Sequence, residues 1–131
     1  MHEIAVLMKA CDMAEQIAKD NRIRRIAYLR LEVGELTGYL PVFFEKYYPI
    51  AIEGRPVFEG SELIIDEVRG EGMCNACHSL YNIMKHEGRC PKCGSRDKTI
   101  LGGQTFKIKD IGVAQEEDGD FEGSKEAPAG T

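Results

Sequence analysis

Four cysteines with metal-ligand spacing are the residues of this sequence whose chemistry is most evident. Cys74 and Cys77 form one C-x2-C pair, and Cys90 and Cys93 form a second pair after a spacer of twelve residues. Two thiolates two residues apart can face one ion from a tight turn, and two such turns supply the four soft ligands that tetrahedral zinc prefers. The spacing therefore predicts a structural zinc site. Because four thiolates close the coordination sphere, this zinc is expected to fold a module rather than to catalyse.

The residues around the cysteines favour a zinc ribbon. Pro91 lies inside the second pair, where its fixed φ presets the turn, and Gly94 follows that pair, where glycine permits a positive φ. The interval between the pairs is short and suits a small hairpin, with the apolar residues Leu80, Tyr81, Ile83 and Met84. Residues 70–102 are therefore expected to form a zinc-ribbon domain.

Disulfides and a thiol redox site are the competing interpretations of these cysteines. The sequence opens Met1-His2-Glu3, without the basic region and apolar run of a signal peptide, so a reducing cytoplasmic location is expected and disulfides are disfavoured. A redox C-x-x-C motif would begin a helix in a βαβ context, and Cys74 does not lie in one. Structural zinc is therefore the preferred interpretation.

The charge distribution argues against nucleic-acid binding. Lys and Arg number 17 against 22 Asp and Glu, for a net charge of -5. The excess lies in the tail, at Glu116, Glu117, Asp118, Asp120, Glu122 and Glu126. The rest of the chain is balanced and lacks the basic field that supplies most nucleic-acid affinity. The acidic tail, residues 116–131, is expected to be disordered, and no apolar stretch approaches the ~20 residues that span a bilayer.

Two early segments are expected to form a helix and a strand. From Ile4 to Lys19, apolar residues recur every three or four positions, which is typical of an amphipathic helix, and Cys11 lies on the apolar stripe as a small core residue. Arg25 to Val33 alternates as a half-buried strand does. Its two faces are expected to carry Ala27, Leu29, Leu31 and Val33 on one side, and Tyr28, Arg30 and Glu32 on the other.

A second helix is expected to begin at Pro41, which suits the first helical turn. Pro49 lies where an uninterrupted helix would continue, so a kink or an early end near Tyr48 is predicted. Core packing is preferred to a ligand pocket as the use of its apolar residues, which are Val42, Phe43, Phe44, Tyr47 and Ile50.

Two later strands are expected on either side of the cysteines, one at 63–68 and one at 105–111. The predicted fold class is therefore α+β, with a small three-stranded sheet, two helices and an inserted zinc-ribbon module. The first domain is expected to be discontinuous, formed by residues 1–69 and 103–115.

His2 is a second candidate metal ligand. The α-amino group of Met1 has an ordinary pKa near ~7.8 and is readily deprotonated by a metal. A free amine, one or two backbone amides and an imidazole can form fused chelate rings, and such nitrogen-rich sites suit Ni(II) or Cu(II) better than zinc. From the residues alone the signal is weak, because a terminal His often binds nothing. The other histidines, His78 and His86, lie in the zinc module; His78 is expected to be a spectator, although a role as an alternate ligand stays open.

Several motifs, taken together, resemble the HypA/HybF family of nickel-insertion accessory proteins for nickel-iron hydrogenases. The resemblance covers residues 1 to about 113 in order and departs from the family at Pro49 and in the tail after Gln115. The motifs are Met1-His2-Glu3, Val33-Gly34-Glu35-Leu36, Glu62-Leu63, Cys90-Pro91-Lys92-Cys93-Gly94-Ser95 and Phe106-Lys107-Ile108-Lys109-Asp110-Ile111.

The resemblance implies a nickel metallochaperone. In that family Ni(II) is bound through the terminal amine, backbone amides and the His side chain, which correspond here to Met1, His2 and Glu3. The zinc ligands correspond to Cys74, Cys77, Cys90 and Cys93. The implied partners are a HypB-type nickel-insertion GTPase or ATPase and the hydrogenase large-subunit precursor, with Ni2+ as transferred cargo and Zn2+ as a structural ion.

Two other functions stay open at this point. A zinc-ribbon adaptor without a labile metal would make His2 incidental, and nickel titration separates it from the chaperone. A hydrolase is the weakest hypothesis, because the sequence offers neither a nucleophile with a base nor a zinc ligand set with an open position. The chain is therefore not expected to be an enzyme.

Overall fold

The computed structural model describes residues 3–114. The predicted nickel ligands Met1 and His2, and the predicted disorder of residues 116–131, lie outside these described residues.

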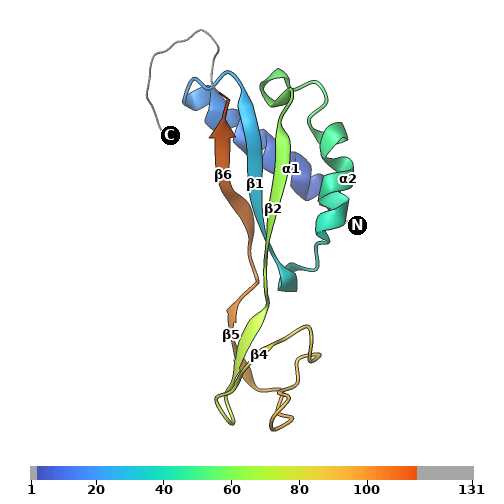
Figure 1. Cartoon of the computed structure of the whole chain (residues 1–131), viewed down its shortest axis with the longest axis vertical. Helices are drawn as coiled ribbons and strands as arrows, with labels where there is room; N and C mark the ends of the chain where they lie inside the picture. The colour runs from blue at the N-terminus through green and yellow to red at the C-terminus, as the bar shows by residue number, and fades with distance from the viewer. Residues whose placement is uncertain (1–2, 115–131) are drawn as a thin grey trace.

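The larger part of the molecule is a three-stranded sheet with two helices. Helix α1 spans Glu3–Asp20, helix α2 spans Pro41–Ala51, and short 3-10 turns occupy Glu35–Thr37 and Pro56–Phe58. The strands of this sheet are β1 (Ile26–Gly34), β2 (Glu62–Val68) and β6 (Phe106–Val113). Their order is β2-β1-β6, with β2 parallel and β6 antiparallel to the central β1. Figure 1 shows this two-helix part occupying one end of an elongated molecule.

The cysteine-bearing part is a second, smaller sheet. It contains β3 (Glu71–Cys74), β4 (Leu80–Asn82) and β5 (Lys98–Gly102), in the order β4-β3-β5 with both pairings antiparallel. All three strands lie between β2 and β6 in the sequence, and they extend away from the helices at the other end of the molecule (Figure 1). The predicted α+β class with an inserted ribbon is therefore confirmed.

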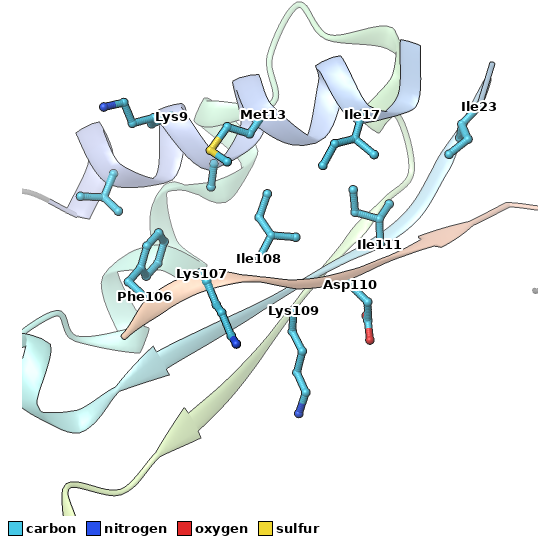
Figure 2. A pocket seen from close by; sticks show the side chains of 12 residues that line it. Lys9, Met13, Ile17, Ile23, Phe106, Lys107, Ile108, Lys109, Asp110 and Ile111 are labelled. Carbon is cyan, nitrogen blue, oxygen red and sulfur yellow. The ribbon is translucent and has the colours of Figure 1, made fainter. Parts of the chain in front are cut away.

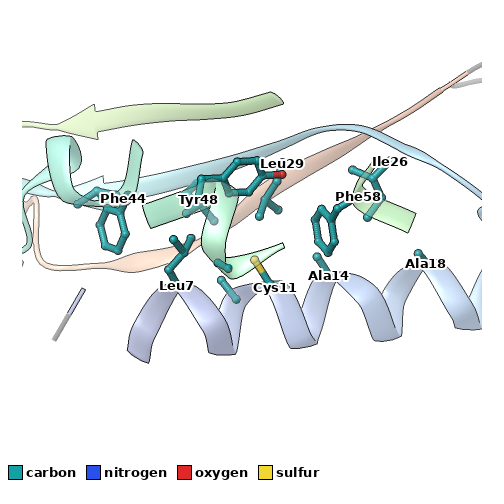
Figure 3. Packing of buried hydrophobic residues seen from close by; sticks show 13 residues of the cluster. Leu7, Cys11, Ala14, Ala18, Ile26, Leu29, Phe44, Tyr48 and Phe58 are labelled. Atoms are coloured by element: carbon teal, nitrogen blue, oxygen red, sulfur yellow. The ribbon is translucent and has the colours of Figure 1, made fainter. Parts of the chain in front are cut away.

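The core of the two-helix part forms where α1 and α2 pack on one face of the first sheet (Figure 3). Cys11 is fully buried on the inner stripe of α1, as predicted, and desolvation raises the pKa of its thiol to about 11. The thiol is therefore neutral at physiological pH. The buried cluster is Leu7, Ala10, Cys11, Ala14, Ala18, Ile26, Leu29, Leu31, Val33, Phe44, Tyr48, Ala51 and Phe58.

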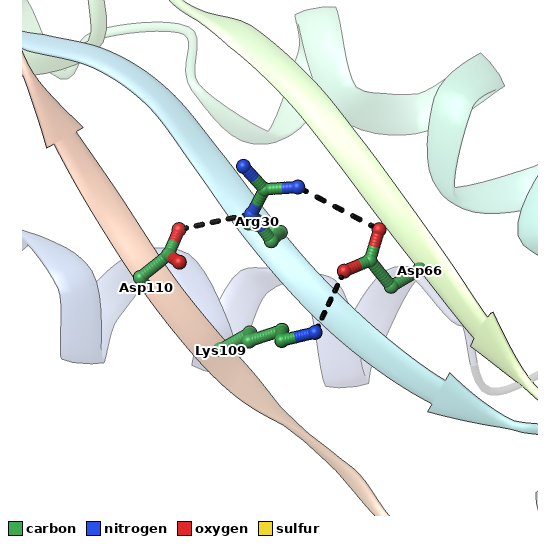
Figure 4. A network of polar contacts seen from close by, with 4 residues as sticks. All are labelled: Arg30, Asp66, Lys109 and Asp110. Atoms are coloured by element: carbon green, nitrogen blue, oxygen red, sulfur yellow. Dashed lines mark hydrogen bonds and ion pairs between the residues drawn. The ribbon is translucent and has the colours of Figure 1, made fainter.

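The opposite face of this sheet carries a network of charges (Figure 4). Arg30 Nε lies 3.1 Å from Asp110 Oδ1, and Arg30 Nη1 lies 3.7 Å from Asp66 Oδ1. Lys109 Nζ lies 3.1 Å from Asp66 Oδ2. These residues link all three strands across a solvent-facing surface.

No helix in the described part of the chain is long and apolar enough to cross a membrane.

Of the two outcomes predicted for Pro49, the early helix end near Tyr48 was wrong, because α2 continues through Pro49 to Ala51, and a kink stays a prediction. Pro49 lies in the last turn with its ring exposed, so it removes one helical hydrogen bond at the end rather than in the middle. The Nε–H of Arg55 donates to the carbonyl of Ala51 at 3.0 Å and satisfies one terminal acceptor.

The predicted inner face of β1 was wrong at its first residue. Ala27 is only half-buried, whereas Ile26 is fully buried. The pairing of β1 with β6 shifts register between Ile26 and Tyr28, and such an irregularity resets the alternation of side chains. From Leu29 onward the predicted faces are confirmed.

Candidate metal centre

The four cysteines come together at the outer end of the second sheet. Cys74 ends β3 and Cys77 lies in the turn that leads to β4, while Cys90 and Cys93 lie in the turn before β5. Their four sulfur atoms all lie within 4.8 Å of one another. Within residues 3–114 they are the one group of three or more His, Cys, Asp and Glu side chains close enough to share an ion.

The sulfur spacing fits a tetrahedral metal site. Cys74 Sγ lies 3.4 Å from Cys93 Sγ, and Cys77 Sγ lies 3.6 Å from Cys90 Sγ. Four sulfurs at the Zn–S distance of ~2.3 Å would be separated by about 3.8 Å along each tetrahedral edge. A disulfide requires sulfurs ~2.05 Å apart, and all four are free thiols. The geometry matches a shared ion and contradicts the disulfide interpretation.

The two cysteine pairs have the same local backbone structure. His78 N donates to Cys74 O at 2.8 Å, and Gly94 N donates to Cys90 O at 2.8 Å. The residue after each pair has a positive φ, which is 66° at His78 and 79° at Gly94. The prediction for Gly94 is confirmed. His78 occupies the equivalent position in the first turn, so its backbone shapes that turn while its side chain is exposed.

The sulfurs compete for protons because they lie in contact. The hydroxyl of Ser79 lies 3.3 Å from Cys77 Sγ, and this hydroxyl together with the Ser79 N–H lowers the pKa of Cys77 to about 6. The N–H of Ser95 lowers the pKa of Cys93, but contact with Cys74 and the other sulfurs outweighs it and raises that pKa to about 12. A bound cation would stabilise all four thiolates at once, which is what this donor set requires.

The cysteine-bearing part has little apolar core. Its buried apolar side chains are Cys74, Tyr81 and Cys90, with Ile83 packed against them. Tyr81 also donates a hydrogen bond from its hydroxyl to Gly88 O at 3.3 Å. Two of these three side chains are predicted metal ligands, so a bound ion would take the place of a larger apolar core in this part.

Glu3 is the one predicted nickel-site residue that the structure describes. It is the first residue of α1, and its side chain is only 5% exposed. Its Oε2 accepts a hydrogen bond from Leu40 N at 3.2 Å, just before α2 begins. The carboxylate thus ties the starts of the two helices together. Glu3 therefore lies in the two-helix part and the four cysteines lie in the second sheet and its turns, while Met1 and His2 are outside the described residues.

An apolar groove of about 730 Å³, which no sequence pattern indicated, lies between α1 and β6 (Figure 2). Met13 and Ile17 line it from the helix and Ile108 and Ile111 line it from the strand. It lies apart from the four cysteines. The apolar period of the first helix includes Ile17, and only the packing of α1 on the sheet shows that this side chain is left 39% exposed.

The fold and the cysteine cluster define a class of small metal-binding proteins, in which a two-helix α+β part carries a ribbon with four thiolate ligands. Residues 1–113 match the family model described as HypA, hydrogenase/urease nickel incorporation, metallochaperone. The chain therefore belongs to the HypA family, as the sequence motifs predicted. This is a family of hydrogenase maturation factors and nickel metallochaperones rather than of catalysts.

Individual relatives span nearly the same length. The hydrogenase maturation factor HypA of Chlorobium luteolum is 31% identical over 88% of this chain and 98% of its own length. The hydrogenase maturation factor HybF of Klebsiella pneumoniae is 32% identical over 85% of this chain and 97% of its own length. The solution structure of the Ni metallochaperone HypA from Helicobacter pylori has the same fold, with a TM-score of 0.61 at 23% identity, covering 88% of this chain and 100% of that one.

Proposed function

We propose that this protein carries Ni(II) bound at Met1, His2 and Glu3 and delivers it to the precursor of the hydrogenase large subunit. A HypB-type GTPase or ATPase is proposed as its partner in nickel insertion. The observation that carries the proposal is the family match over residues 1–113, which includes the Met1-His2-Glu3 motif. We also propose a cytoplasmic location, where the precursor and a reducing environment would both be met.

The proposed nickel chemistry uses nitrogen atoms at the N-terminus. The Met1 amine and the His2 imidazole would lose protons to the metal, and the backbone amides of His2 and Glu3 can complete the chelate. The Glu3 carboxylate accepts a hydrogen bond from Leu40 N, so its role in joining the helices is compatible with a backbone contribution to nickel binding. A chelate at the start of a helix can be reached by solvent and by a partner, as metal transfer requires.

We propose zinc as the ion held by Cys74, Cys77, Cys90 and Cys93. The sulfur spacing and the soft donor set support this assignment, and a sphere closed by four thiolates supports a structural role. When bound, the ion would supply positive charge that keeps all four cysteines deprotonated. The residues of this site therefore hold the ribbon together rather than exchange cargo.

Nickel titration of zinc-loaded protein that begins at Met1 tests the proposal. His2→Ala should abolish stoichiometric Ni(II) binding by calorimetry, and an extra residue before Met1 should weaken it, because the chelate uses the terminal amine. His86→Ala, at the half-buried histidine of the cysteine-bearing part, is the matched control and should bind nickel as the unmodified protein does. Zinc content should be the same in all variants. Full nickel binding by His2→Ala would place the cargo site elsewhere.

The two metals should also separate by pH. Nickel must displace protons from the amine and the imidazole, so its affinity should fall steeply below pH ~6.5, the ordinary pKa of histidine. Zinc should stay bound over the same interval, because coordinated cysteines remain deprotonated well below their free pKa of ~8.5. Visible absorption and metal analysis between pH 7.5 and 5.5 measure both. Nickel affinity that did not change across this range would exclude the amine and imidazole chelate.

A zinc-ribbon adaptor without labile metal is the second candidate. The cysteine-bearing part exposes apolar side chains that suit contact with another protein, with Leu80 64% and Leu101 56% exposed. An adaptor would retain zinc and bind a maturation partner, yet show no stoichiometric nickel binding in the same titration. That combination of results would favour the adaptor hypothesis over the chaperone hypothesis.

A further inference from the structure

Three chain segments meet between the two sheets. They are the end of β1, the link at residues 69–70 between β2 and β3, and the link at residues 103–105 between β5 and β6. Leu36 N donates to Gly103 O at 2.7 Å, and Gly34 N donates to Thr105 O at 2.8 Å. The second sheet is therefore joined to the first by two covalent links that cross close to the turn after β1.

Glycines allow this crossing. Gly103 has a φ of 94°, and a Cβ on it would lie 2.6 Å from Arg69 O. A Cβ on Gly34 would overlap the carbonyl of Gly103. Larger residues are excluded at both positions. Glycine has more freedom in φ and ψ than other residues. These glycines therefore let the segments pack closely, but they do little to prevent one sheet from rotating relative to the other.

Glu35 supplies a side-chain contact across this junction. It lies in the 3-10 turn that follows β1, and its Oε1 accepts hydrogen bonds from Gly70 N at 2.8 Å and from Asn82 Nδ2 at 3.1 Å. The Gly70 N–H and then the Asn82 amide lower the pKa of the Glu35 carboxyl, so it is ionised at neutral pH. Glu35 thus joins the two-helix part to two positions of the segment 70–102, the link into β3 and the end of β4.

The partners of Glu35 lead toward the second cysteine pair. Asn82 is the last residue of β4, and its Oδ1 accepts a hydrogen bond from Lys85 N at 2.7 Å. Gly70 O accepts a hydrogen bond from Ile83 N at 2.7 Å. One carboxylate thus holds both the link into β3 and the start of the turn that continues to Cys90.

We propose that Glu35 is a positioning residue that fixes the orientation of the cysteine-bearing sheet relative to the two-helix sheet. It acts by accepting two hydrogen bonds across a glycine-rich junction that would otherwise rotate. A fixed orientation holds the ribbon at a constant angle to the two-helix part. The proposal does not depend on nickel binding, because it concerns the junction alone.

Residual dipolar couplings of the full-length, zinc-loaded protein test this role. The couplings of β1, β2 and β6 and those of β3, β4 and β5 should fit one alignment tensor in the unmodified protein. Glu35→Ala should reduce the alignment of the cysteine-bearing sheet by at least about twofold relative to the other sheet, because motion of a flexibly linked unit averages its couplings toward zero. Zinc content and the amide shifts of the two-helix core should not change.

Three further variants separate positioning from general destabilisation. Glu35→Gln keeps an acceptor oxygen and should restore the single tensor, while Asn82→Ala removes one of the two bonds and should give an intermediate loss. Glu67→Ala is the matched control, because Glu67 pairs with Val33 at the same end of the sheet and its exposed side chain forms no hydrogen bond or ion pair within residues 3–114. A single tensor in both Glu35→Ala and Asn82→Ala would overturn the proposal, as would a Gln variant no better aligned than Ala.

Discussion

The two sheets of this protein are stabilised in different ways. The two-helix part buries a continuous apolar cluster that includes Leu7, Leu29, Phe44 and Phe58, all fully buried. The cysteine-bearing part buries one large side chain, Tyr81, beside two of its own cysteines. One region therefore has a hydrophobic core, and the other has a candidate metal site in the place of a core.

This difference shows how a short chain can contain two folded units. Burying apolar surface contributes roughly 25 cal/mol per Å², so a core needs many large side chains to offset the entropy of ordering the chain. A structural zinc contributes an apparent ~10–16 kcal/mol through four ligands alone. The polar, glycine-rich segment that carries the cysteines can fold by the second route and not by the first.

The largest expected effect comes from removing the ligands. Cys74→Ala with Cys93→Ala should lose the zinc equivalent and unfold β3, β4 and β5, because nothing else in that part supplies a core. The amide signals of β1, β2 and β6 should persist in a heteronuclear NMR spectrum. Metal analysis provides the second measurement. A full equivalent of zinc retained by the double variant would contradict the assignment of the site.

Removing a buried side chain from the hydrophobic core should destabilise the two-helix part and leave the zinc site intact. Phe44→Ala should lower the free energy of unfolding of the two-helix part by roughly 3–5 kcal/mol, because Phe44 is fully buried and its removal leaves a cavity. Val42→Ala on the same helix is the control; Val42 is 60% exposed, so the change should stay within about 0.5 kcal/mol. Urea unfolding measures both. Loss of zinc from folded Phe44→Ala protein would show that the two regions are not independent.

The cysteines of the two regions should differ in their reactivity toward alkylating reagents. After metal removal the cysteine-bearing part should unfold and expose its four cysteines to solvent, whereas Cys11 stays in the core, where burial raises the pKa of its thiol to about 11. At pH 8 the thiolate fraction of Cys11 should therefore be on the order of a hundredfold lower than that of a solvent-exposed thiol with the ordinary pKa of ~8.5. Iodoacetamide followed by mass spectrometry should give four fast modifications and a fifth only on unfolding.

The raised pKa of Cys11 predicts that the free energy of unfolding of the two-helix part depends on pH. An acid whose pKa is raised by folding favours the folded state below its unfolded pKa, and this contribution is lost as pH rises toward the folded value. The stability difference between the unmodified protein and Cys11→Ala should therefore shrink between pH ~8.5 and about 11. Urea unfolding across this range checks the sign, and a difference that grew with pH would contradict it.

The smallest effect is expected on the charged face. Asp66→Ala removes the partners of Arg30 and Lys109, yet these side chains are partly exposed, so the loss should be about 1 kcal/mol or less and should diminish at high salt. Urea unfolding at low and high ionic strength measures it. A loss as large as that of Phe44→Ala would mean that this network, rather than the core, holds the sheet together.

Much of this architecture could be predicted from local patterns. The spacing of the cysteines predicted which four sulfurs come together, and the period of apolar residues predicted α1 and the three strands of the first sheet, because both signals depend only on residues close in sequence. Gly94 was correctly expected to adopt a positive φ for the same reason. The predicted early end of α2 near Tyr48 was wrong, because the free-energy cost of Pro49 depends on its position relative to the helix end, which local sequence does not give.

Only the tertiary structure decided how these pieces are joined. The parallel pairing of β1 with β2, the irregularity that buries Ile26 in place of Ala27, and the groove between α1 and β6 all depend on residues far apart in the chain. Glu35 is the clearest case. It lay within a motif in the sequence, but its hydrogen bonds to Gly70 and Asn82 span 35 and 47 positions. Local patterns specify which elements form, whereas long-range packing specifies which side chains hold them in place.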